Sequence, residues 1–238
     1  MPDAVFTALP LSNGLQCIAK NGPWQPSADL ERQVGVIWDE ESRRLGQVLF
    51  DGIIFSAAEY SSEHILGSWI RYRYALAGYK NPELGRELGV LPVAVNGISL
   101  LNDQILLGRR SNKVAAFPGK WELAPSGGID ERDCQAKVNV SYVKALYREL
   151  QEETGLEANT VEQALPWRLV EDRQVNTLEL CMKLYLSPTA TDYFHPTSSE
   201  YSEFCWLHQA QIGDFLLQHQ AAVVPLAEYL LKSLVAAD

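Results

Sequence analysis

Apolar and acidic positions recur with a helical period in the stretch that ends at Gly155. Asn139 and Ser141 are both residue types that start helices, and glycine just past the last periodic position is a common stop signal. At about 100° per residue, the apolar side chains share one arc and three glutamates share the neighbouring arc. The pattern therefore predicts an amphipathic helix, with an apolar face (Val143, Leu146, Tyr147, Leu150) and an acidic face (Glu149, Glu152, Glu153).

Short apolar runs between turn residues predict strands on both sides of this helix. The expected strands are Leu91–Leu101, Gln104–Leu107, Trp121–Ala124, Trp167–Asp172, Thr177–Leu186 and a strand that contains Trp206 and ends at Leu207. Two segments near the end of the chain, Ile212–Gln218 and Val223–Val235, have the Ala and Leu spacing of helices that pack on a core.

The leading part of the chain is predicted to be a separate, β-rich module. We expect Gln33–Trp38 and Gln47–Phe55 to form a hairpin around a polar turn, while Ile65–Leu76 fits a strand or a helix equally well. A break at Asn81–Gly85 places the boundary near residue 88, so the expected units are residues 1–88 and residues 89–238. Aromatic residues of the module would form a core or the surface of a homodimer, or else line a pocket for a base or sugar.

Composition and charge narrow the classes of function. A hydrophobic fraction of 47% in 238 residues predicts a globular protein, and a net charge of −10 argues against binding to a nucleic acid backbone. The apolar segment at residues 221–237 is interrupted by charged residues and proline, which predicts an amphipathic helix and no membrane span. No signal peptide is expected, and the unpaired spacing of the cysteines (Cys17, Cys134, Cys181, Cys205) fits reduced thiols in the cytoplasm.

The acidic face has two interpretations when its spacing is considered alone. Three neighbouring carboxylates repel one another, and their hard oxygen donors suit Mg²⁺ or Mn²⁺ rather than zinc. Most charge runs of this kind are simply helix faces in contact with solvent. Both interpretations stay open at this point.

The segment Arg148–Leu156 reads Arg-Glu-Leu-x-Glu-Glu-x-Gly-Leu, which resembles the second half of the Nudix box, the signature of hydrolases that cut nucleoside diphosphates linked to another group. Ser126–Glu131 resembles the opening of that box. The further glutamate expected between the two halves would fall at Cys134 or Val140, and neither is acidic. The stretch Arg132–Val140 is therefore interpreted as an insertion that lengthens the loop before the helix.

The resemblance implies a fold and a set of active-site residues. The fold would be an α/β/α sandwich around a mixed sheet, and the chemistry would be metal-dependent hydrolysis of a diphosphate. The metal ions, Mg²⁺ or Mn²⁺, would be held by side chains and one carbonyl (Glu149, Glu152, Glu153, Gly128). Arg148 would orient Glu149, and the catalytic base would be Glu149, Glu153 or Glu200, with Glu203 as the substitute for Glu200.

Two further features suggest contacts with the substrate. Arg109 and Arg110 follow a predicted strand, and their planar groups suit phosphate oxygens, although a pair of surface arginines is an equal alternative. The glycine pair at Gly127 and Gly128 allows the backbone to approach a ligand closely, as Gly127 would do toward the substrate.

The substrate class follows from the layout of the chain. A leading module, Gly-Arg-Arg-Ser at Gly108–Ser111 and an expanded spacer before the helix are similar to the UDP-glucose and UDP-galactose pyrophosphatase branch. A nucleotide sugar is thus the expected small-molecule partner, and ADP-ribose is the rival. Two other classes stay open: an isopentenyl-diphosphate isomerase, for which Cys134 would be the candidate cysteine, and a regulator that binds a nucleotide without cleaving it.

Overall fold

The computed structural model describes residues 5–20, 24–46, 49–135 and 138–236. The chain divides into two compact units that are interleaved along the sequence. The first comprises Met1–Val95, Gly127–Ala145 and Pro166–Cys181, and the second comprises Asn96–Ser126, Leu146–Leu165 and Met182–Asp238. The boundary expected near residue 88 stays a prediction. In the part of the chain that is described, no helix is long and apolar enough to cross a membrane.

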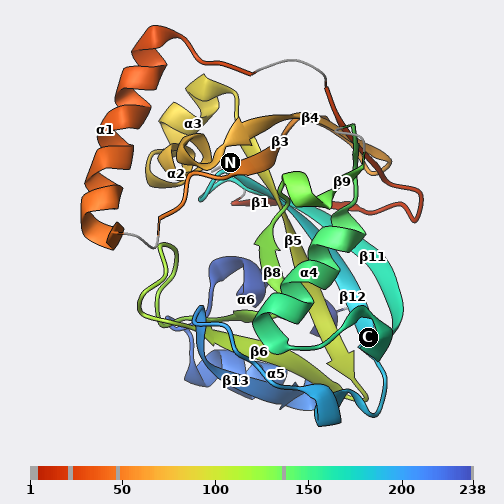
Figure 1. Ribbon diagram of the computed structural model, residues 1–238. Helices are drawn as coiled ribbons and strands as arrows, with labels where there is room; N and C mark the ends of the chain where they lie inside the picture. The colour runs from red at the N-terminus through yellow and green to blue at the C-terminus, as the bar shows by residue number, and fades with distance from the viewer. Residues whose placement is uncertain (1–4, 21–23, 47–48, 136–137, 237–238) are drawn as a thin grey trace. The chain divides into compact units, whose positions relative to one another are not determined.

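The predicted hairpin in the leading segment is wrong, because Gln33–Trp38 and the turn after it lie within one helix, α1 (Ala28–Leu45; orange in Figure 1). Ser27 caps this helix by accepting a hydrogen bond from Leu30 N, and the acidic first turn and basic last turn match the helix dipole. Within α1, the side chain of Val34 is fully buried. Residues 47–48 of the second expected strand lie outside the described residues, and the next strand begins at Ile53.

The first unit combines strands and helices. Both kinds of strand pairing occur in it: β2 (Gln16–Ala19) runs parallel to β4 (His64–Arg71), while the strand Ile53–Tyr60 runs antiparallel to β4. The stretch Ile65–Leu76, which fits two elements in the sequence, is in fact both, since β4 leads directly into α2. The remaining elements with residues in this unit are β1 (Phe6–Pro10), β3 (Ile53–Tyr60), α2 (Tyr72–Lys80), α3 (Pro82–Leu88), β9 (Cys134–Gln135) and β10 (Asn139–Val140).

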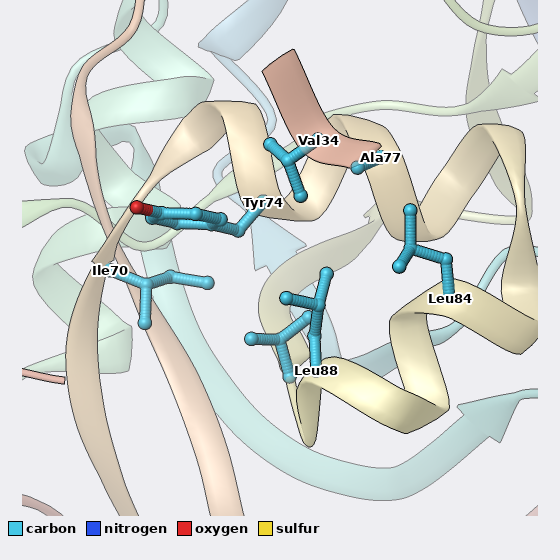
Figure 2. Close-up of a cluster of buried hydrophobic side chains, with 7 residues drawn as sticks. Val34, Ile70, Tyr74, Ala77, Leu84 and Leu88 are labelled. Carbon is cyan, nitrogen blue, oxygen red and sulfur yellow. The ribbon is translucent and has the colours of Figure 1, made fainter. Parts of the chain in front are cut away.

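A cluster of apolar side chains forms the core beside these helices. Figure 2 shows side chains from α1, β4, α2 and α3 pointing toward one another; the cluster comprises Val34, Ile70, Tyr74, Ala77, Leu84, Leu88 and Val90. Asn81 ends α2 and caps α3, since its side chain accepts a hydrogen bond from Leu84 N and Pro82 occupies the first turn of α3. The break predicted at Asn81 is therefore a helix cap.

The second unit is built around β6 (Gln104–Arg110). This strand pairs antiparallel with β13 (Tyr201–His208), with the end of β5 (Leu91–Leu101) and with β7 (Trp121–Leu123). Two helices, α5 (Ile212–Gln218) and α6 (Pro225–Val235), complete the chain. Five elements run from one unit into the other along the sequence: β5, β8 (Ser126–Gly128), α4 (Tyr142–Thr154), β11 (Val161–Asp172) and β12 (Thr177–Leu186).

Most of the predicted elements after residue 90 are present. The strands at β5 and β12 and the helix α5 have the predicted bounds, and the expected class, a mixed α/β sheet with helices, is confirmed. The amphipathic helix is α4, which follows Ser141 and ends at Gly155, where φ is 77°. Asn139 belongs to β10, so Ser141 is the start signal that the chain uses. The predicted insertion forms the short strands β9 and β10, with residues 136–137 outside the described residues.

Candidate active site

The three acidic side chains of α4 differ sharply in exposure. The side chain of Glu152 is 50% exposed and that of Glu149 is 13% exposed, while Glu153 as a residue is only 2% exposed. A helix face that simply contacts solvent would leave all three open to water. Burial of Glu149 and Glu153 therefore argues against that interpretation, because a buried carboxylate is costly unless it has a partner or a function.

Glu153 is held by two neutral hydrogen-bond donors. Ser126 N donates to Glu153 Oε2 at 3.1 Å, and the Tyr201 hydroxyl lies 3.2 Å from Glu153 Oε1. Burial raises the pKa of Glu153 well above its usual value, and the charges of Glu122, Glu149 and Glu200 raise it further. The backbone hydrogen bond from Ser126 opposes this shift in pKa.

Glu149 is paired with the arginine that precedes it. Arg148 Nη1 donates to Glu149 Oε1 at 2.6 Å and to Glu152 Oε2 at 3.4 Å. Burial is the main reason why the pKa of Glu149 rises to about 7, and it outweighs the opposing effect of Arg148. The charges of Glu152 and Glu200 add to the rise, so these acids act on one another at short range.

A further buried acid, Glu122 on β7, belongs to the same cluster and was missed in the sequence. Glu122 is 7% exposed, and burial raises its pKa, although the positive charge of Arg110 opposes the rise. Arg110 Nη1 makes a short ion pair with Glu122 Oε1, and the Tyr201 hydroxyl lies 2.7 Å from the same oxygen. The alternation of Trp121, Glu122 and Leu123 would place Glu122 on the opposite strand face, but no local signal reveals what that face contacts.

The remaining predicted residues of the second unit, Glu200, Arg109 and Glu203, are exposed. Glu200 is exposed directly before β13, and its carbonyl accepts a hydrogen bond from Ser111 N at 2.6 Å. Its charge raises the pKa of Glu122, Glu149 and Glu153. Arg109 Nη1 lies 3.6 Å from Glu203 Oε2, and its Nε donates to the Gly119 carbonyl.

A comparison with protein-family models assigns this chain to a family. The model of the NUDIX domain matches residues 90–229, which is more than half of the chain and includes α4 and the strands β6, β7 and β13. The chain belongs to the Nudix family. The resemblance of Arg148–Leu156 to the Nudix box is thereby confirmed at the level of the family.

The chain is similar to solved structures and to a curated relative. A solved structure provisionally described as a Nudix hydrolase has a TM-score of 0.50 at 12% identity and covers 84% of this chain and 96% of its own. A NUDIX hydrolase from Nitrosomonas europaea has a TM-score of 0.42 at 18% identity, with 62% and 90% covered. An isopentenyl-diphosphate Delta-isomerase from Paenarthrobacter aurescens is 27% identical over 135 residues; the match spans 53% of this chain and 66% of that relative.

The Nudix family implies a divalent cation, and the acids of α4 fit one in chemical type. Carboxylate oxygens are the donors that Mg²⁺ and Mn²⁺ prefer. Burial, followed by the charges of neighbouring acids, raises the pKa of Glu149 and of Glu153, and a bound cation would offset both effects. Within the described ranges, however, no three His, Cys, Asp or Glu side chains are arranged to hold a metal ion. Glu149 is turned to Arg148 and Glu153 to Tyr201, so their carboxylates would have to turn to bind one.

The glycine pair lies on β8. Gly127 and Gly128 follow Ser126, whose N–H contacts Glu153, but the two glycines belong to the first unit. A side chain at Gly128 would meet no atom within 4 Å, so its lack of a Cβ is not required by neighbouring protein atoms. The roles predicted for both glycines, toward substrate and metal, stay predictions.

Proposed function

We propose that this Nudix protein hydrolyses the diphosphate linkage of a nucleoside diphosphate derivative with the help of a divalent cation. The observation that carries the proposal is the burial of Glu149 and Glu153 next to the charges of Glu122 and Glu200. Such a concentration of acid in one place lowers stability, which makes it a feature of a functional site rather than of a structural one. The family assignment supports the same conclusion.

The reaction requires compensation of the negative charge on the diphosphate and a water molecule positioned for attack. The water oxygen forms a bond to one phosphorus, the bond from that phosphorus to the bridging oxygen breaks, and a proton from the water passes to a carboxylate; a nucleoside monophosphate and a second phosphate monoester result. Glu149, Glu152 and Glu153 would hold the divalent cation, which would supply compensation for the charge of the diphosphate oxygens and a lower pKa for a bound water.

The protein's own side chains would share the other tasks. Arg148, which donates a charge-assisted hydrogen bond to Glu149 at 2.6 Å, is the proposed orienting group for that carboxylate. Glu149, Glu153 and Glu200 are the candidates for the group that accepts the proton. Of the two arginines proposed for phosphate, Arg110 is engaged by Glu122 and by the Ala116 carbonyl, while Arg109 has 47% of its side chain exposed.

The substrate class that we propose is a nucleotide sugar such as UDP-glucose, which would give UMP and glucose 1-phosphate. The support is the layout of the sequence, in which Gly108–Ser111 and the lengthened spacer after Gly128 are similar to the UDP-sugar branch of the family. ADP-ribose, which has the same diphosphate linkage, is the rival substrate.

The test is a panel of substrates incubated with the whole protein in Mg²⁺ or Mn²⁺. UDP-glucose, UDP-galactose, ADP-ribose, a dinucleotide and nucleoside triphosphates would be compared by release of phosphate monoesters. We expect the highest kcat/KM for a UDP-sugar. A preference for ADP-ribose would replace the substrate but keep the reaction, and cleavage of triphosphates alone would refute the proposed linkage.

One relative favours a second candidate function. The 27% identical protein named isopentenyl-diphosphate Delta-isomerase makes proton transfer at carbon an alternative for a diphosphate held in the same place. Cys134, the cysteine considered for that chemistry, is half-buried on β9. Incubation with isopentenyl diphosphate distinguishes the two, because an isomerase changes the carbon skeleton's double bond and releases no phosphate.

A further inference from the structure

The paired strands β6, β7 and β13 divide their side chains between two faces of one sheet. Directly opposed residues in antiparallel pairs share a face, and neighbours along a strand alternate. Gly108 is opposite Glu122, and the Tyr201 ring covers Gly108, so this is the face of the buried acids. Arg109 is opposite Trp121, which packs against α5, and therefore belongs to the other face. The exposed arginine of the pair thus leaves its strand on the side away from the buried acids.

A lysine directly before β7 belongs to the face of the buried acids. Lys120 lies two residues before Glu122, and Arg110 N donates to the Lys120 carbonyl at 2.8 Å, which continues the pairing of β6 with β7. Lys120 is thus opposite Arg110 and shares its face. We propose that Lys120 binds a phosphate group of the diphosphate substrate. This inference rests on the proposed function and adds to it a residue of the loop between β6 and β7.

Lys120 differs from the arginines of the site in having no carboxylate partner. Arg110 makes a short ion pair with Glu122, and Arg148 pairs with acids of its own helix. Within the described residues Lys120 forms no ion pair, and its ammonium group lies 5.7 Å from the centre of the Phe117 ring. A diphosphate near several acids requires positive charge, and an ammonium group with no carboxylate partner can supply it.

The loop that leads to Lys120 is held by contacts along its length. Arg110 Nε donates to the Ala116 carbonyl at 2.9 Å, and the Arg110 carbonyl accepts from Gly119 N at 3.0 Å. Gly119 forms a bulge with φ of 74°, and Phe117 has φ of 46°, a conformation that residues with a side chain rarely adopt. Such strain persists only where surrounding contacts impose it, and it is common at ligand-binding positions. The half-buried Lys120 side chain therefore extends from a fixed backbone.

The experiment removes the charge and keeps the apolar stem of the side chain. Lys120→Met, Lys120→Arg and the wild type would be compared for binding of inorganic pyrophosphate at one Mg²⁺ concentration, by isothermal titration calorimetry, together with the thermal midpoint. For Lys120→Met we expect the affinity to fall by about 10–100-fold at a nearly unchanged midpoint, as for loss of a hydrogen bond between charged groups. Lys120→Arg should retain most of the affinity, because it keeps the positive charge.

Two further variants test the assignment of the sheet faces. Lys113→Met is the matched control, because Lys113 is an exposed lysine of the same loop and its substitution removes the same charge. It should bind pyrophosphate as the wild type does. Arg109→Met should lower the affinity less than Lys120→Met, because Arg109 belongs to the opposite face.

The outcomes separate this inference from the proposed reaction. Equal affinity of Lys120→Met and wild type would overturn the role of Lys120, and so would an equal loss in Lys113→Met, a larger loss in Arg109→Met or a wild type that binds no pyrophosphate. Weaker binding specific to Lys120→Met would support the role even if the substrate panel showed no hydrolysis, in which case only the proposed reaction fails. Hydrolysis with an unchanged KM in Lys120→Met would leave the reaction standing and reject the role.

Discussion

Two buried tyrosines, one in each unit, show how differently the two regions use burial. Tyr74 belongs to the apolar cluster of the first unit, and its hydroxyl donates at 2.7 Å to Glu31, whose side chain is 43% exposed. Tyr201, in the second unit, is buried to the same extent, but both carboxylates near its hydroxyl are buried as well. The two tyrosines are equally buried, but the hydroxyl of Tyr74 contacts a carboxylate that reaches solvent and the hydroxyl of Tyr201 contacts only buried ones.

The energetic consequences of the two surroundings also differ in sign. Burial of an apolar side chain stabilises a protein by roughly 1.5–3 kcal/mol, and a hydrogen bond from Tyr74 to a carboxylate that reaches water adds to this. Burial of acids such as Glu122 and Glu153 costs stability, which hydrogen bonds and one arginine only partly offset. The apolar cluster should therefore govern stability, and the acidic cluster should govern activity.

The largest expected effect is on activity and comes from Glu153→Gln. The substitution removes a charge from the proposed cation site, and we expect kcat to fall by about 10²–10⁴-fold, as for loss of a group that acts in the reaction. The free energy of unfolding without metal should be equal or higher at pH 7, because a buried acid with a raised pKa is removed. Steady-state kinetics and urea unfolding measure the two quantities.

Glu162→Gln is the matched control for this substitution, since Glu162 is an exposed glutamate on β11 in the same unit. It should leave both kcat and stability unchanged. If Glu153→Gln kept the wild-type kcat, the acidic cluster would have no part in the reaction and the contrast between the two regions would be lost.

The second effect is on stability and comes from Leu84→Ala in the apolar cluster. Leu84 is 3% exposed, so its truncation leaves a cavity, and we expect a loss of about 2–5 kcal/mol in the free energy of unfolding. Activity per folded molecule should stay the same. Leu217→Ala is the control, because Leu217 is 69% exposed and should change stability by less than about 0.5 kcal/mol. A fall in kcat for folded Leu84→Ala would show that the cluster also supports the reaction.

The sequence predicted the fold well wherever one periodicity was strong. The runs at β5 and β12 and the heptad-like face of α4 left little choice of structure. The prediction for the leading segment is wrong because the six residues Gln33–Trp38 do not by themselves contain the helix signals that surround them. The capping Ser27 and the helical spacing of Leu30, Val34 and Ile37, all of which contact the apolar cluster or belong to it, are visible only in a longer window.

The candidate site was predictable only where its residues are close in the sequence. Arg148, Glu149, Glu152 and Glu153 share one helix turn and a half, so their grouping follows from α4 alone. Glu122 and Tyr201 are 79 residues apart, and their contact depends on the pairing of β7 and β13 with β6. No local pattern in one sequence reveals such a contact, which is why the acid on β7 and the tyrosine on β13 were missed.

A third effect is on stability and concerns the end of α4, the helix that carries Glu149, Glu152 and Glu153. Gly155 ends α4 with φ of 77°, and a Cβ there would lie 2.7 Å from the His195 carbonyl oxygen. We expect Gly155→Ala to lower the free energy of unfolding by about 1–3 kcal/mol, because a side chain is strained in that conformation. Gly213→Ala is the control: in α5, with no atom within 4 Å of the added Cβ, it should be neutral or gain up to about 1 kcal/mol. Equal stability of the two variants in urea unfolding would contradict the assigned helix end.

The smallest effect on stability at neutral pH is expected for Tyr74→Phe, which removes the one hydroxyl of the apolar cluster's tyrosine. Loss of the hydrogen bond to Glu31 should cost about 0.5–1.5 kcal/mol at pH 7. Burial, followed by the contact with Glu31, raises the pKa of Tyr74 from 10.0 to about 12. The folded protein therefore holds this proton more tightly than the unfolded chain, so the contribution of Tyr74 is fully present below pH 10 and is lost as the pH rises toward 12. Urea unfolding of both proteins at several pH values should show the wild type losing its higher free energy of unfolding between pH 10 and 12. If the difference between the two proteins stayed constant through pH 12, the Tyr74 hydroxyl would titrate in the folded protein as it does in water.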